Sequence, residues 1–143
     1  MSPANLDLVR SINAAHECGD FSSVEWAHPE IEWVIADGPS PGSWKGRAGM
    51  VESFRDNLIG WKDLRTEVDE YVELDDERVL VLTRSTAHGK AGGQVVGQLR
   101  TKGAALYEVR AGKVRRLVYY WDRERALADV GLSREGVAPD HPA

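Results

Sequence analysis

The chain of 143 residues carries a formal net charge of −5 at pH 7, with 42% hydrophobic and 29% charged residues. This length and composition indicate one soluble globular domain with one core, and no apolar run is long enough to cross a bilayer. The acidic balance argues against nucleic acid as the main partner, a single cysteine excludes an intramolecular disulfide, and the lack of a basic-then-apolar N-terminal segment leads us to expect a cytoplasmic protein.

The N-terminal half predicts three helices and one strand. Residues 3–18 carry apolar side chains at steps of three, which is typical of an amphipathic helix, and Gly19 predicts its end. We expect a shorter helix over residues 20–27 and a third over residues 46–58. Residues 31–35 alternate between apolar and polar side chains and predict a strand.

A proline- and glycine-rich stretch, residues 37–43, separates that strand from the third helix and ends at Trp44. Its composition predicts a loop. Both a plain connector and a lid over a binding site are open interpretations of this loop.

The C-terminal half predicts a run of four strands and a terminal helix. In chain order, the strands are expected at residues 64–74, 79–88, 94–109 and 113–122, and the helix at residues 123–130. The first half of the strand 79–88 is apolar at every position, which predicts burial on both faces. Gly97 and Gly103 indicate bulges or bends in the strand that follows. Residues 1–132 therefore form the domain, and residues 133–143 are expected to be a poorly ordered tail.

Helices first and hairpins afterwards indicate an α+β domain. We expect a curved antiparallel β-sheet wrapped around three N-terminal helices, forming a conical pocket. A pocket of this kind can hold a small ligand.

The strand 113–122 is the stretch that organises this prediction, because it is long, mostly apolar and ends in the carboxylate Asp122. Alternation places Asp122 on the same face as Tyr120. It also places His88 on one face with Thr86 and Arg84. An arginine in a largely apolar strand needs a carboxylate partner, and Asp122 is the expected partner of Arg84. Asp122 as a simple helix cap is an equally open reading.

Several segments in this order resemble the nuclear transport factor 2-like superfamily, which also contains ketosteroid isomerase, limonene epoxide hydrolase and the SnoaL-like polyketide cyclases. The matching segments, spread over residues 4–131, are Ala14-Ala15 to Gly19-Asp20, His28 to Trp33, Trp44 to Arg47, Arg110 to Val114, and Tyr119 to Leu127. The resemblance implies the cone-shaped fold. It does not imply one activity, because a single scaffold hosts unrelated chemistries.

The family's reactions match these residues only in part. The resemblance places Ile12 where ketosteroid isomerase has its tyrosine, and that activity is rejected. It places Arg84 and Asp122 on two of the three catalytic positions of limonene epoxide hydrolase, with Thr86 at the third in place of an acid. It also places Asp122 on the acid/base position of the SnoaL-like cyclases. Their histidine on the neighbouring strand is missing, and His88 is the nearest substitute.

Three hypotheses remain for the function: a cofactor-independent isomerase, cyclase or hydrolase centred on Asp122, a non-catalytic small-molecule binding protein, or a dimeric interaction module. The ligand is expected to be small, apolar and cyclic. The expected catalytic residues are Asp122, Arg84 and His88, and the expected ligand-binding residues are Trp33, Trp44, Phe54, Thr86 and Tyr120. The four histidines are dispersed and no glycine-rich phosphate loop follows a strand, so we expect neither a metal nor a cofactor. A homodimer through the sheet is the expected assembly.

Overall fold

The computed structural model describes residues 3–17, 24–38, 41–59, 61–91 and 94–132, and it describes the backbone alone for residues 3, 56–59, 61–64, 87–91 and 94–100. These residues form three helices and six strands. In chain order they are α1 (Pro3–Glu17), β1 (Ala27–Ile35), β2 (Gly42–Lys45), α2 (Gly46–Ile59), β3 (Trp61–Glu73), β4 (Arg78–Ala91), β5 (Gln94–Arg110), β6 (Lys113–Tyr120) and α3 (Arg123–Asp129). No helix among the described residues is long and apolar enough to cross a membrane.

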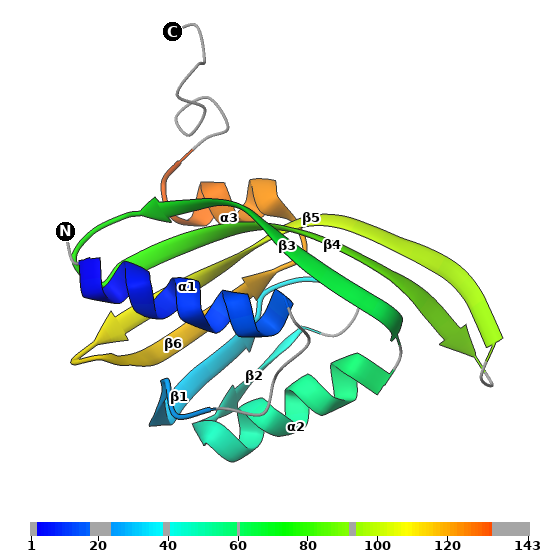
Figure 1. Ribbon diagram of the computed structural model, residues 1–143, viewed down its shortest axis with the longest axis horizontal. Coiled ribbons are helices and arrows are strands. Elements are labelled where there is room, and N and C mark those ends of the chain that lie inside the picture. Colours follow the sequence, from blue (N-terminus) through cyan, green and yellow to red (C-terminus); the bar gives the residue numbers. More distant parts are fainter. Residues whose placement is uncertain (1–2, 18–23, 39–40, 60, 92–93, 133–143) are drawn as a thin grey trace, which may run out of the picture.

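The six strands form one curved sheet in the order β2-β1-β6-β5-β4-β3, and β4 and β5 extend beyond their neighbours as a long arm (Figure 1). The α+β class and the curved sheet confirm the fold expected from the sequence. The expected sheet is antiparallel throughout, but in the observed sheet β1 and β6 run parallel. The two strands are far apart in the chain, and no local residue pattern reports such a pairing.

Helices cover the two faces of the sheet unequally. The helices α1 and α2 lie against the inner, concave face, while α3 lies on the outer, convex face (Figure 1). The core is divided in the same way. One cluster joins Val9, Ile12 and Met50 of these two helices to side chains such as Val79, Val81 and Trp33, and the other joins Ala126 and Leu127 of α3 to side chains such as Leu80, Leu82 and Tyr120.

Strand β4 shows the division residue by residue. Val79 and Val81 belong to the concave cluster, whereas Leu80 and Leu82 belong to the convex one. Because side chains alternate along a strand, Ser85 continues the concave series and Arg84 the convex series. The predicted burial of this strand on both faces is confirmed.

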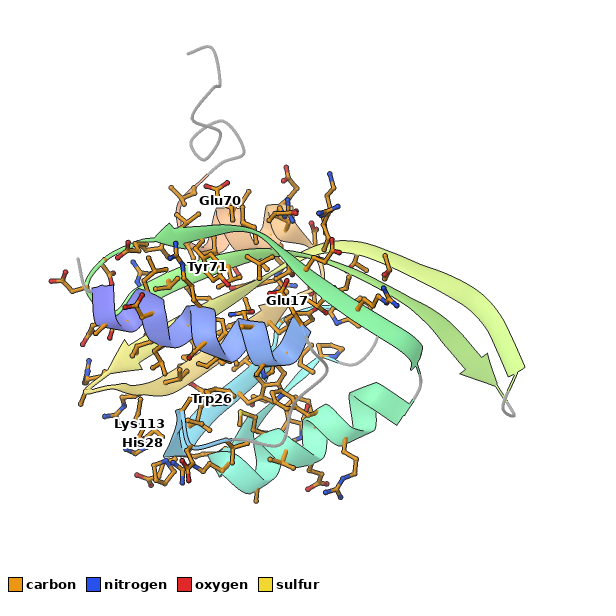
Figure 2. The ribbon with its side chains drawn as sticks, in the orientation of Figure 1. Glu17, Trp26, His28, Glu70, Tyr71 and Lys113 are labelled. Carbon is orange, nitrogen blue, oxygen red and sulfur yellow. The ribbon has the colours of Figure 1, made fainter. Side chains whose placement is uncertain are left out.

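A bulge in β3 changes which side chains face the helices. The register of β3 against β4 shifts between Val68 and Glu70. After the shift Tyr71 points toward α1, where the guanidinium of Arg10 lies 5.4 Å from its ring centroid, while Glu70 points away from that helix (Figure 2). Asp69 therefore lies at the bulge, between the two parts of β3 that pair with β4 in different registers.

Several predicted boundaries differ from the observed ones. The helix expected over residues 20–27 falls partly outside the described residues, and its last residue, Ala27, begins β1 instead. The loop expected over residues 37–43 ends in β2, whose four residues pair with β1. The strand expected over residues 79–88 is longer, because β4 continues to Ala91. The expected tail, residues 133–143, lies outside the described residues.

Candidate functional site

Asp122 stands at the start of α3, where its side chain caps the helix. Its backbone is extended, with φ −108° and ψ 109°, and its Oδ1 accepts a hydrogen bond from the backbone N–H of Glu124 at 3.0 Å. The residue is exposed. Its own backbone N–H donates to Asp37 Oδ2 at 3.2 Å. Of the two roles that the sequence left open for Asp122, the observed contact is that of a helix cap.

Arg84 pairs with Asp69 and Glu67, so the expected pairing with Asp122 is wrong. Its Nε lies 2.6 Å from Asp69 Oδ1 and its Nη2 lies 3.2 Å from Glu67 Oε2. Glu67 is directly opposite Arg84 in the β3–β4 register. The bulge in β3 turns the neighbouring Asp69 toward the same guanidinium. Two carboxylates on the adjacent strand therefore pair with Arg84 in place of Asp122, which lies beyond the end of β6.

Asp69 also forms an ion pair with Arg123, so that the side chains around Asp69 form a charged network on the convex side. Arg123 Nη2 lies 2.8 Å from Asp69 Oδ2 and donates to the backbone carbonyl of Thr83 at 2.7 Å. Burial raises the pKa of Asp69, but the hydrogen bonds from Arg123 and Arg84 outweigh burial and hold that pKa below its usual value. These charges partner one another and attach α3 to the sheet, which is a structural role.

The other expected residues near Asp122 also belong to the convex side. Thr86 is exposed and alternates with Arg84 along β4. Tyr120 is 4% exposed within the cluster under α3, and its hydroxyl donates to Asp129 Oδ2 at 3.0 Å. Burial and the nearby Asp129 carboxylate raise the pKa of Tyr120 to about 12. The backbone of His88 lies in β4, opposite Gln98, and its side chain lies outside the described part of the structure.

A row of aromatic rings crosses the concave face. We call Phe54, Trp33 and Tyr119 the aromatic row. The Trp33 and Phe54 ring centroids lie 5.0 Å apart in an edge-to-face contact, and the Trp33 and Tyr119 centroids lie 6.4 Å apart in a stacked contact. Trp33 Nε1 donates to Ser53 Oγ at 2.8 Å, so its polar atom is satisfied. His16 of α1 extends the row, with its ring centroid 6.1 Å from that of Phe54.

Trp44 stands beside this row on the same face. It lies opposite Trp33 in the β1–β2 register and packs at the margin of the concave cluster. Its ring leaves little room around it, because a Cβ on Gly42 would come within 3.0 Å of the indole. The structure thus brings together three of the expected ligand-binding residues, Trp33, Trp44 and Phe54, on the concave side. It does not bring Thr86 or Tyr120 to that side.

Four hydroxyl groups on the concave face were not singled out from the sequence. Thr66 Oγ1 and Ser85 Oγ lie 3.1 Å apart, and the Ser85 hydroxyl lies near the Tyr119 phenol. Burial raises the pKa of Tyr119, the Ser85 contact opposes that rise, and the Asp37 carboxylate adds to it. Thr83 is 2% exposed, and its hydroxyl has no hydrogen-bond partner. Strand alternation could have predicted three of them. It places Ser85 and Thr83 on the same face of β4 as Val81, and it places Tyr119 on the inward face of β6.

The described side chains also line an open depression of about 610 Å³ on the outer side of α2. Its lining consists of Val24, Arg47, Ala48, Val51, Glu52 and Arg55. None of the expected site residues contributes to it. The expected ligand-binding residues that the structure brings together lie in or beside the aromatic row, and we take this part of the concave face as the candidate site.

Solved structures share this fold over most of their length. An NTF2-like protein of unknown function from Burkholderia pseudomallei is 20% identical, with a TM-score of 0.72 over 92% of this chain and 99% of that chain. TerC, co-crystallised with polyporic acid, is 20% identical, with a TM-score of 0.70 over 89% and 97% of the two chains. A proposed polyketide cyclase from Xanthomonas campestris pv. campestris is 21% identical, with a TM-score of 0.63 over 90% and 97%. At these identities the likeness shows the fold alone.

The sequence comparisons give the family. No curated protein matches this chain. The profile of the SnoaL-like domain matches residues 9–117, which is most of the described sheet together with α1 and α2. This match and the fold agree with the resemblance drawn from the sequence, and the chain belongs to the SnoaL-like domain family.

Proposed function

We propose that this chain binds a small cyclic molecule on the concave face, packed against the aromatic row. The observation that carries the proposal is the uneven burial of that row. Trp33 is 6% exposed, while Phe54 and Tyr119, whose rings pack on it, are partly rather than fully buried residues. Other apolar side chains of this face, such as Ile31 and Val81, are fully buried. Partly exposed aromatic residues such as Phe54 and Tyr119, next to a fully buried core, favour contact with a ligand.

The chemistry of the face favours a flat and uncharged ligand. Aromatic side chains contribute large apolar area and prefer stacked or edge-to-face contacts with other rings. The polar groups beside them, on Thr66, Ser85 and Tyr119, are hydroxyls that donate and accept hydrogen bonds without carrying charge. Polyporic acid, which was co-crystallised with TerC, carries acidic hydroxyls and serves as the charged comparison compound beside uncharged ring compounds.

Binding is proposed ahead of catalysis at Asp122. A general acid or base acts on a group within hydrogen-bond reach. Asp122 caps α3, which packs on the convex side, and its Oδ1 is engaged by the backbone of Glu124. The isomerase, cyclase or hydrolase reaction expected for Asp122 stays a prediction that the same experiment tests.

Isothermal titration calorimetry with polyporic acid, α-tetralone and tetralin tests the proposal. We expect saturable one-to-one binding of at least one compound to the wild-type protein. Phe54→Leu, which removes one ring of the row, weakens that binding by roughly 2- to 10-fold, the loss expected for one aromatic contact. Asp122→Asn serves as the control, because a change at the α3 cap leaves the concave face intact.

Two results would contradict the proposal. One is the absence of saturable binding by any of the three compounds. The other is the reverse order of effects, in which Asp122→Asn abolishes binding and Phe54→Leu leaves it unchanged. The second result would also move the ligand to the convex side and restore the catalytic role expected for Asp122.

A further inference from the structure

The depression on the outer side of α2 has a surface of its own. Its volume of about 610 Å³ lies within the range typical of small-molecule sites, about 300–1,000 Å³. Met50 and Phe54 of α2 pack in the concave cluster, so the opposite face of the helix points away from the core. Four lining residues recur at helical spacing along that opposite face: Ala48, Val51, Glu52 and Arg55.

Apolar side chains form one part of the lining. Val24 belongs to the turn that leads into β1, where its carbonyl accepts a hydrogen bond from the backbone N–H of Ala27 at 3.0 Å. Val24 and Val51 are half-buried, and Ala48 is exposed. A ligand that covers these three side chains removes apolar surface from water, which stabilises the complex.

Two arginines without a carboxylate partner form the other part of the lining. Arg47 donates from Nε to the Ala27 carbonyl at 2.8 Å and from Nη2 to the Glu25 carbonyl at 3.4 Å, so its charge meets only neutral groups. Arg55 is exposed, and its side chain makes no hydrogen bond or ion pair with the residues that the structure describes. By contrast, Arg84 on the sheet is paired with two carboxylates.

The local charge of the depression is opposite in sign to that of the whole protein. Glu52 is the one carboxylate among the described lining residues, so the two arginines leave an excess of positive charge in a protein of formal net charge −5. Guanidinium groups bind carboxylates through charge-assisted hydrogen bonds. An inorganic anion would leave the apolar side chains uncovered, and a plain hydrocarbon would leave both arginines without a counter-charge.

We propose that this depression binds a small amphipathic carboxylate. Its hydrocarbon part packs on Val24, Ala48 and Val51, and its carboxylate pairs with Arg55 and Arg47. No residue of the aromatic row is among the described lining residues. The inference therefore adds a second site and does not depend on the ligand proposed for the concave face.

Octanoate, 1-octanol and acetate separate the two parts of the proposed ligand. Titration followed by nuclear magnetic resonance should show saturable shifts of the backbone amides of α2 with octanoate. Acetate, which lacks the hydrocarbon chain, should bind at least about tenfold more weakly, and 1-octanol, which lacks the charge, at least about threefold more weakly. Added salt should weaken the binding of octanoate but not of 1-octanol, because salt screens the ion pair.

Substitutions of exposed side chains change the charge of the depression without touching the core. Arg55→Gln should weaken the binding of octanoate by about three- to tenfold, because it removes one charged hydrogen-bond donor. Glu52→Gln should strengthen it by about two- to threefold, because the opposing carboxylate is removed. Arg65→Gln is the matched control. It removes an exposed arginine of β3, outside the depression, and should change the affinity by less than about 1.5-fold.

Three results would overturn the inference. The first is the absence of saturable octanoate binding, and the second is equal affinity for octanoate and 1-octanol. The third is an affinity that Arg55→Gln leaves unchanged, or lowers no more than Arg65→Gln does. The function proposed for the concave face is tested separately, with ring compounds and Phe54→Leu, so either proposal can fail without the other.

Discussion

Polar side chains on the two faces of this sheet are of different chemical kinds. On the convex side they are charged and partnered: Arg84 and Arg123 share Asp69, and Tyr120 donates to Asp129. On the concave side they are neutral hydroxyls beside aromatic rings, and one of them, on Thr83, has no partner. The convex contacts fasten α3 to the sheet. On the concave side, the Thr83 hydroxyl leaves its hydrogen-bonding capacity unused.

The contrast between the two faces shows how charged residues in a strand should be interpreted. A carboxylate and an arginine close to the end of a central strand resemble a catalytic pair in the sequence. Here each has a structural partner, because Asp122 caps α3 and Arg84 pairs across to β3. The less conspicuous residues, Ser85 and Tyr119, lie on the concave face, where the Tyr119 ring is part of the aromatic row. Function is therefore better sought where polar groups are neutral and incompletely paired.

The largest expected effects come from truncating one buried side chain on each face. Trp33→Ala should lower the free energy of unfolding by about 3–5 kcal/mol, and Leu82→Ala, under α3, by about 2–5 kcal/mol. Urea denaturation measures both. Only Trp33→Ala should also abolish the calorimetric ligand signal. Loss of that signal in folded Leu82→Ala would show that the two faces do not act separately.

Asp69→Asn should weaken the convex network. We expect a loss of about 1–2 kcal/mol, because two hydrogen bonds to charged groups lose strength and both arginine pairs are partly screened by solvent. The pKa of Asp69 lies below its usual value of 3.8, so the folded protein binds the proton less readily than the unfolded chain. The stability from this carboxylate is then present above about pH 4 and lost as the pH falls through the lowered pKa.

Urea midpoints recorded over an acid series test that dependence. The difference between the wild-type protein and Asp69→Asn should narrow as the pH falls below about 4. A difference that stays constant over the acid range would contradict the assigned role of Asp69. Ligand affinity at neutral pH should not change, because Asp69 faces α3.

Substitutions at Asp122 separate capping from catalysis. Asp122→Ala should cost about 1 kcal/mol, whereas Asp122→Asn should cost only a few tenths, because asparagine caps a helix nearly as well as aspartate does. Thermal melting followed by circular dichroism measures both changes. Equal costs for the two variants would argue against capping. If the wild-type protein shows turnover and Asp122→Asn abolishes it, the catalytic prediction is supported. The assignment of purely structural roles to the convex face would then be contradicted.

The smallest expected effect concerns two threonines of β4. Thr83→Val removes a buried hydroxyl that has no partner and should raise the free energy of unfolding by up to about 1 kcal/mol. Thr86→Val, on the exposed side of the same strand, should stay within about 0.5 kcal/mol of the wild-type protein. A marked destabilisation by Thr83→Val would show that the Thr83 hydroxyl has a partner in solution.

The sequence predicted the α+β class and the alternation of the strands. It could not predict which face the helices α1 and α2 cover. The first half of β4 is apolar on both sides, because α3 buries the convex side as α1 and α2 bury the concave one. The expected pocket therefore combined Trp33 and Phe54 with Tyr120, residues of opposite faces.

The partners of the charged residues also depended on features that local patterns do not report. The bulge beside Asp69 turns its carboxylate to Arg84, and the sequence gives no glycine or proline to mark it. The strand β2 was hidden in a stretch rich in proline and glycine. By contrast, the register shift of β4 against β5 lies opposite Gly97, where the sequence indicated a bulge.

The crystal structure of the complex with the tightest-binding compound of the calorimetric series tests the central claim most directly. We predict a ligand on the side of the sheet that α1 and α2 cover, with its ring against Phe54 and Tyr119. A ligand on the α3 side, in contact with Asp122 and Arg84, would contradict it.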